Sequence, residues 1–221
     1  MKVDNHLLND LKPLADTDQV GEILDAMEEL KFSHLPVVDQ DRIYLGVVCE
    51  DDLLEVSEES DVLGKHSHLL KSYSVARASN LYEAIKIIGE GNLSLLPVIS
   101  DEKKYVGYLS ANEVVQDLGR DLTFSETGGV IVLKVPVRDY QLTQISQIVE
   151  SEDARIMGIH MSNSTETDQL NICLKINQVD LSRIIKSFER YNYIIVEVFH
   201  QSIFDENVAD RYESFMKYIN T

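Results

Sequence analysis

The pattern of apolar and polar positions in the first half of the chain occurs twice, at a fixed spacing of 61 residues. The apolar stretch Leu-Pro-Val-Val at 35–38 returns as Leu-Pro-Val-Ile at 96–99, and Gly46 returns as Gly107. Self-similarity at a fixed spacing indicates one supersecondary unit that is used twice. We therefore expect about the first 120 residues to contain two copies of one fold.

Within the first repeat the pattern predicts a helix, two strands and a second helix. Apolar residues recur at helical spacing between 20 and 30, and two apolar strands are expected at 35–38 and 44–49. The acidic residues that follow suit the positive end of a helix dipole, so a further helix is expected at 50–56. The second repeat copies this βαββα-type plan.

Individual residues predict where these elements begin and end. Asp18 and Ser79 are expected to cap the first helix of each repeat, because their side-chain oxygens can accept hydrogen bonds from first-turn amides. Pro36 is expected to open its strand, where no ladder hydrogen bond is lost. Gly89 and Gly91 are expected to end the helix of the second repeat early.

After residue 124 the pattern changes. It predicts strands at 130–135, 155–161, 170–176 and 193–199, and helices at 142–149 and 181–188. The strict alternation at 170–176 predicts one buried face. The order βαββαβ is typical of a ferredoxin-like domain. A last amphipathic helix with an aromatic stripe is expected to dock on this chain or on a second one.

The expected organisation therefore has three segments. They are residues 1–124 with repeats at about 10–62 and 69–122, an α+β domain at 125–200, and a C-terminal helix at 201–221.

The charge of the 221-residue chain is −18 and is unevenly distributed. Residues 1–63 carry 17 acidic and 4 basic side chains, whereas residues 64–124 carry 7 of each. A nucleic-acid-binding protein needs a basic face to neutralise phosphates, and no part of the sequence supplies one. No apolar run reaches the length of a membrane span, and no signal peptide is visible. We expect a cytoplasmic protein in which Cys49 and Cys173 are buried free thiols.

The sequence contains no recognisable catalytic motif or metal-binding motif. His66 and His68 are two residues apart, and His34 lies before an expected strand. All three lack a nearby cysteine or carboxylate at metal-ligand spacing, so a solvated linker is expected here rather than a zinc site. We therefore expect no enzyme activity, no metal and no cofactor beyond a small-molecule ligand.

With these motifs the chain resembles a tandem pair of CBS domains followed by an ACT domain, the arrangement of the acetoin-utilisation accessory protein family. The resemblance implies a cytosolic regulatory protein that forms a homodimer or a larger homo-oligomer and acts on an unknown protein target. It also implies an adenine-containing ligand of the AMP, ATP or S-adenosylmethionine type, bound between the two CBS motifs.

The resemblance implies a set of ligand-binding residues. The family's ribose and phosphate contacts sit on a pattern Gly-h-h-(Ser/Thr)-x-x-Asp, where h is hydrophobic. The first motif keeps Asp52 but has Cys49 at the hydroxyl position, and the second keeps Ser110 but has Glu113 at the aspartate position. The remaining candidates are Asp18, Ser79, Pro97 and Arg77.

The two motifs differ in the charge of the residues around them, and this charge affects how well each can bind a nucleotide. Like charges beside the acidic first motif would each cost a phosphate on the order of 1 kcal/mol. The second motif has Arg77, Lys103 and Lys104 in nearby loops. We therefore expect a nucleotide at the second motif, or an uncharged adenosine-like ligand at the first.

Two alternatives remain open. ACT domains often bind amino acids beside a turn that carries glycine, and here Asp139, Tyr140 and Gln141 occupy that turn, with Tyr140 at the glycine position. In this first alternative the chain is an amino-acid sensor that binds its ligand through the ACT domain. The other alternative is a structural module that dimerises through the edge strands of the ACT domain. In that case the ligand sites are degenerate, and Asp52, Ser110 and Glu113 serve only as helix caps.

Overall fold

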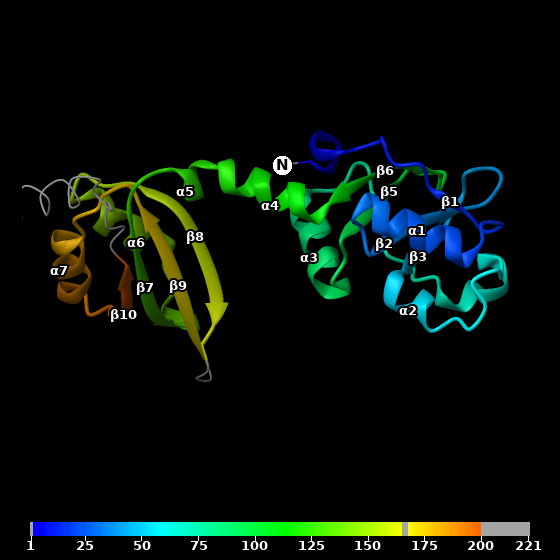
Figure 1. The fold of residues 1–221 in the computed structure, drawn as a ribbon. Helices are drawn as coiled ribbons and strands as arrows, with labels where there is room; N and C mark the ends of the chain where they lie inside the picture. Colours follow the sequence, from blue (N-terminus) through cyan, green and yellow to red (C-terminus); the bar gives the residue numbers. More distant parts are fainter. Residues whose placement is uncertain (1, 165–167, 200–221) are drawn as a thin grey trace, which may run out of the picture. The chain divides into compact units, whose positions relative to one another are not determined.

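The computed structural model describes residues 2–164 and 168–199, which divide into two compact units between Gly119 and Arg120 (Figure 1). Each unit has its own apolar core. The C-terminal helix predicted at 201–221 lies outside the described residues. None of the described helices is both long enough and apolar enough to span a membrane.

The first unit contains the two predicted repeats. The elements of the first repeat are β1 (Leu14–Ala15), α1 (Val20–Leu30), β2 (His34–Val38), β3 (Tyr44–Cys49) and α2 (Glu50–Leu54). Those of the second are β4 (Val75–Ala76), α3 (Leu81–Gly91), β5 (Leu95–Ile99), β6 (Tyr105–Ser110) and α4 (Ala111–Arg120). The 3-10 helices η1 (Val3–His6) and η2 (Leu63–Leu69) each precede a repeat. The sheets have the orders β1-β2-β3 and β4-β5-β6.

The expectation that Pro36 opens its strand is wrong. Pro36 is the third residue of β2 and is paired with Val47 of β3. The other neighbour of β2, strand β1, pairs only with Val37 and Val38. At Pro36 the strand therefore has a partner on one side only, and the missing N–H leaves no ladder bond unmade.

The predicted helix caps are displaced by one residue. The N-caps are Gln19 and Asn80, and the Asn80 side-chain oxygen accepts a hydrogen bond from the Glu83 amide (3.1 Å). Asp18 instead accepts a hydrogen bond from the Ala15 amide at 2.8 Å. The Ser79 amide donates to the Ala76 carbonyl in the corresponding turn of the second repeat.

The helix of the second repeat does not end early at its glycines. Helix α3 runs through Gly91 and has 11 residues, as many as α1. Gly89 has open space where a side chain would lie. Asn92 ends the helix in the left-handed conformation, and Lys31 has the same role after α1.

The segment that leads into each repeat crosses to the strand of the other repeat. Leu8 exchanges two backbone hydrogen bonds of 2.9 Å with Tyr108 of β6, and Lys71 exchanges two of 2.9 Å with Val47 of β3. A Cβ atom on Gly107 would lie 2.2 Å from the Leu8 carbonyl oxygen, and one on Gly46 would lie 2.9 Å from Leu70 Cβ. The repeated glycine is thus required by the close approach of the crossing segment.

The second unit has the predicted element order. It comprises α5 (Leu122–Ser125), β7 (Gly129–Pro136), η3 (Val137–Asp139), α6 (Leu142–Glu150), β8 (Ile156–Asn163), β9 (Gln169–Ile176), α7 (Ser182–Arg190) and β10 (Ile194–Phe199). The sheet has the order β10-β7-β9-β8 and is antiparallel throughout. Alternate residues of β7 and β9 are buried in the core with residues of α6 and α7, such as Phe188.

Candidate functional site

The two repeats meet where the first residues of β2 and the segment before β5 are joined by hydrogen bonds. The His34 amide donates to Ser94 Oγ (3.1 Å), and the Ser94 amide donates to His34 Nδ1 (3.3 Å). His34 is paired with Cys49 at the end of β3, and Leu95 is paired with Ser110 at the end of β6. We call this region, with the turns that lead into α2 and α4, the inter-repeat junction.

The junction collects the four residues of the two ligand motifs. Cys49 and Ser110 are both buried, at 9% and 6% exposure. Ser110 Oγ accepts a hydrogen bond from the Glu113 amide at 3.5 Å, whereas Cys49 makes no such cap. Ser110 therefore has a capping role in the first turn of α4. The Glu113 side chain is exposed, and Asp52 is partly exposed.

Asp52 has a partner that sequence reasoning missed. Lys71 Nζ lies 2.6 Å from Asp52 Oδ2. The hydrogen bond with Asp52 raises the pKa of Lys71 above its ordinary value. Lys71 reaches this position because its backbone is paired with Val47 in β3. The prediction omitted the pair because it depends on the crossing of the segment that leads into the second repeat.

His34, expected just before a strand, is part of that strand and is buried rather than solvated. It is the first residue of β2 and is 7% exposed. Because the Ser94 amide donates to Nδ1, this nitrogen carries no proton and the ring is neutral. Burial, and then the charge of Lys71, lowers the pKa of His34, against smaller opposing effects of Asp52 and Asp51.

The other two histidines considered as metal ligands, His66 and His68, lie in η2. His66 Nε2 is 3.2 Å from Asp61 Oδ2, and His68 is exposed. Among residues 2–164 and 168–199, no three His, Cys, Asp or Glu side chains are grouped so that they could hold a metal ion.

Three other predicted ligand residues lie away from the junction. Arg77 and Ser79 follow β4, which pairs with the far end of β5. Residues Leu95 and Ile99, at the two ends of β5, are about 13 Å apart along the strand. Asp18 lies beyond β1 at the corresponding far end of the first sheet. Pro97 is in the middle of β5, where it is buried.

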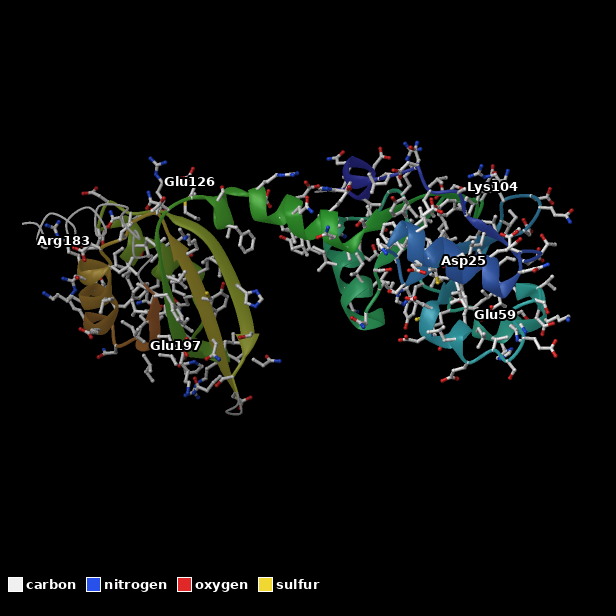
Figure 2. The ribbon with its side chains drawn as sticks, viewed as in Figure 1. Asp25, Glu59, Lys104, Glu126, Arg183 and Glu197 are labelled. Carbon is white, nitrogen blue, oxygen red and sulfur yellow. The ribbon has the colours of Figure 1, made fainter. Side chains whose placement is uncertain are left out.

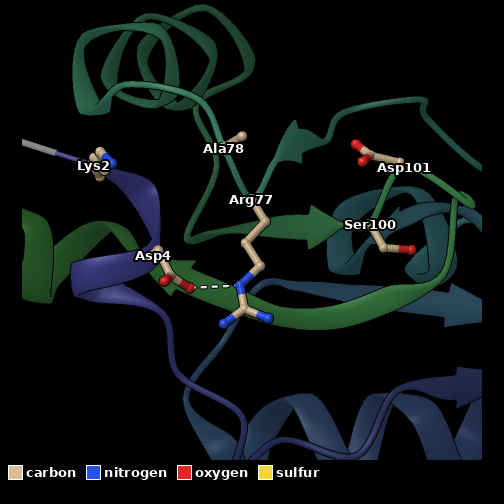
Figure 3. Close-up of a pocket in the computed structure, with 6 residues that line it drawn as sticks. All are labelled: Lys2, Asp4, Arg77, Ala78, Ser100 and Asp101. Atoms are coloured by element: carbon tan, nitrogen blue, oxygen red, sulfur yellow. Dashed lines mark hydrogen bonds and ion pairs between the residues drawn. The ribbon is translucent and has the colours of Figure 1, made fainter.

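Arg77 instead lines a separate pocket of about 370 Å³ (Figure 3). Arg77 Nε donates to Asp4 Oδ1 of η1 at 2.6 Å. Both side chains are largely exposed, so the pair is expected to contribute at most about 1 kcal/mol of stability. The remaining lining residues are Lys2, Ala78, Ser100 and Asp101.

The candidate amino-acid site of the second unit is partly filled by its own side chain. Tyr140 is partly buried and packs against the core. Asp139 is exposed, with its carboxylate 3.7 Å from Arg138 Nε. Gln141 is the N-cap of α6 without a side-chain cap. Where glycine would leave room for a ligand, this turn carries a packed aromatic ring.

Comparison with known proteins identifies the first unit. Residues 9–59 and 70–120 each match the sequence model of the CBS domain. The chain therefore contains a tandem pair of CBS domains. It is 20% identical over 155 residues to the inosine-5'-monophosphate dehydrogenase of Methanocaldococcus jannaschii, and 26% identical over 88 residues to an uncharacterised protein of the same archaeon. The matches cover 68% and 40% of this chain but only 30% and 29% of those relatives.

Several solved structures are similar to about half of the chain. A CBS domain pair/ACT domain protein from Thermotoga maritima is 22% identical, with a TM-score of 0.48, over 53% of this chain and 96% of that one. CBSX2 in complex with AMP is 24% identical (TM-score 0.47), over 53% and 95%. An acetoin utilization protein from Vibrio cholerae is 25% identical (TM-score 0.46), over 53% and 90%.

Proposed function

We propose that this chain is a regulatory protein that binds an adenine-containing small molecule at the inter-repeat junction. One observation carries the proposal. The hydrogen bonds between His34 and Ser94 bring the ends of β3 and β6 to one place, and with them both ligand motifs. CBS domain pairs commonly bind adenosine ligands between such motifs, which supports this assignment.

The proposed mechanism is a population shift. A ligand that contacts both repeats at the junction binds more tightly to one packing of the repeats than to another, and shifts the equilibrium by that difference in affinity. Contacts across the junction include the hydrogen bonds of His34 with Ser94 and the packing of Leu95 and Tyr108 in one apolar cluster with residues of the first repeat, and a bound ligand would act on this packing.

We further propose that the second unit is an ACT-like domain that holds two copies of the chain together. Strand β8 is an edge strand of the sheet, and its apolar residues Ile159 and Met161 are 37% and 50% exposed. An unpaired edge of this kind can pair with a second chain. Light scattering on the full chain should give the mass of a dimer, and Met161→Lys should lower it. A monomeric mass for the unaltered chain would contradict this part.

Thermal melting of the full chain against AMP, ADP, ATP, S-adenosylmethionine and a set of amino acids tests the ligand proposal. At a hundred times the dissociation constant, one ligand adds about 2.7 kcal/mol, which shifts melting by several degrees. We expect such a shift with an adenine compound, and we expect Asp52→Ala or Ser110→Ala to abolish it.

The chain offers matched controls at the other end of the sheets. Asp4→Ala removes an ion-paired carboxylate and Ser100→Ala removes a hydroxyl, and both should leave the shift unchanged. A shift with an amino acid alone would move the site to the turn at Tyr140. The absence of a shift with any compound would favour a structural module with degenerate sites.

A further inference from the structure

The two repeats differ at the position from which the crossing segment faces the ligand motif. In the first motif Lys71 is paired with Val47. In the second, Leu8 is paired with Tyr108, the residue 61 positions after Val47. The same backbone position thus carries an ammonium group at the first motif, whereas at the second it carries Leu8, an apolar side chain that packs against a core cluster.

Lys71 is placed so that its charge faces the junction. Two backbone hydrogen bonds of 2.9 Å hold the origin of its side chain against β3. Its ammonium lies 2.6 Å from Asp52, and its positive charge lowers the pKa of His34. The Lys71 and Asp52 side chains are 46% and 31% exposed. Asp52 Oδ2, the oxygen beside the ammonium, is itself buried, so a ligand can reach this oxygen only after the ammonium has moved.

The ion pair of Lys71 with Asp52 can be exchanged at small cost. Pairs with this degree of exposure typically contribute about 0–1 kcal/mol. An ammonium bound to a phosphate oxygen makes a charge-assisted hydrogen bond of at least equal strength. When the ammonium leaves, Asp52 is free to accept hydrogen bonds from a pair of hydroxyl groups.

We propose that Lys71 exchanges Asp52 for the phosphate of a nucleoside monophosphate, so that the motif of the first repeat selects the phosphorylated form of its ligand. Asp52 then accepts the ribose hydroxyls. This inference rests on the proposed function of the junction. It reverses the sequence-based expectation that a charged nucleotide prefers the second motif, because Arg77, Lys103 and Lys104 lie at or beyond the far end of β5.

Calorimetric titration of the full chain with AMP and with adenosine tests the proposal. We expect AMP to bind about tenfold more tightly than adenosine, in line with one hydrogen bond between charged groups. Lys71→Met keeps the length of the side chain and removes its charge. It should weaken AMP binding about tenfold and leave adenosine binding equal or tighter. Lys71→Arg should retain the preference for AMP.

Two further variants separate this role from general effects. Lys86→Met removes an exposed lysine that lies 3.8 Å from Glu90 on α3, and should change neither affinity. Asp52→Asn should weaken both ligands and keep the preference for AMP. If Lys71→Met weakens AMP and adenosine equally, or changes neither, the exchange is wrong while the junction remains a ligand site. If neither ligand binds the unaltered chain, the proposed exchange of Lys71 is wrong. Thermal melting against the full set of adenine compounds and amino acids then decides whether the proposed function is wrong as well.

Discussion

At the inter-repeat junction the first repeat presents His34 and Cys49 where the second presents Leu95 and Ser110. The backbones of the two repeats have the same strand registers, and helices α1 and α3 are of equal length, but the closing helix has five residues in the first repeat (α2) and ten in the second (α4). The two repeats differ in charge, because acidic side chains far outnumber basic ones in residues 1–63 and equal them in residues 64–124. Acidic side chains of the first repeat, such as Asp25 and Glu59, lie exposed on its surface (Figure 2). The comparison teaches that two repeats can share their strand pairing and still present different polar side chains at the junction.

Gly46 and Gly107 test the crossing of the lead-in segments, which both repeats share. Substitutions at these glycines are expected to have the largest effects on the free energy of unfolding. Gly107→Ala would place a Cβ atom 2.2 Å from a backbone carbonyl oxygen, whereas Gly46→Ala would meet a Cβ atom at 2.9 Å. Overpacking of this kind typically costs about 1–3 kcal/mol. We expect Gly107→Ala to lie at or above the upper end and Gly46→Ala near the lower end.

Denaturant unfolding of the two glycine variants measures this difference. Gly89→Ala is the control, because nothing lies within 4 Å of its added methyl group. Alanine is a better helix former than glycine, so this variant should be neutral or slightly stabilising. Equal losses for Gly46→Ala and Gly107→Ala would show that the two crossings are not packed as the structure has them.

The equivalent serines Ser33 and Ser94 sharpen the comparison at intermediate size. Ser94 Oγ accepts the His34 amide across the junction at 3.1 Å, whereas the hydrogen bond of Ser33 Oγ is with its own neighbour, the His34 ring. We expect Ser94→Ala to cost about 1 kcal/mol and Ser33→Ala less than about 0.5 kcal/mol. The free energy of unfolding of each variant decides, and an equal cost would contradict the unequal roles.

The smallest expected effect is a pH dependence that only the first repeat carries. His34 is neutral when folded, and burial lowers its pKa below the usual value near 6.5. As pH falls below about 6.5 the unfolded state takes up a proton that the folded state refuses, so stability decreases until the folded pKa is reached. Well above pH 6.5 His34 is neutral in both the folded and the unfolded state, so it contributes no pH dependence to the stability there.

His34→Gln tests this term because its amide oxygen can still accept the Ser94 hydrogen bond but does not titrate. The difference in unfolding free energy between the unaltered chain and the variant, measured at pH 7.5 and 5.5, isolates His34 from the acidic groups near it, Asp51 and Asp52. We expect the unaltered chain to lose more stability on acidification. An identical pH profile for both would show that His34 is not held neutral by the fold.

The longer helices and strands were predictable from the sequence, since they follow from local periodicity, whereas no residue range was predicted for the two-residue strands β1 and β4. The alternation at 170–176 gave β9 with its buried face, and the helical spacing at 20–30 gave α1 at the observed bounds. Errors arose where a neighbour decides the outcome. Pro36 is tolerated inside β2 because β1 is too short to reach it. Asn80 takes the place of Ser79 as N-cap, and the Ser79 amide instead closes the turn after β4 by donating to the Ala76 carbonyl.

The candidate site was predictable only as two separate motifs. The sequence by itself determined that a βαββα unit occurs twice, that an acidic residue or a hydroxyl ends each strand-to-helix turn, and that Arg77 carries charge in the second repeat. The tertiary structure alone decided which of these residues lie together. It brought His34 against Ser94 and Lys71 against Asp52, and it placed Arg77 beyond the far end of β5. The reason is physical: the segments that lead into the repeats cross over, and backbone pairing between residues as distant as Leu8 and Tyr108 leaves no periodic signal in either segment.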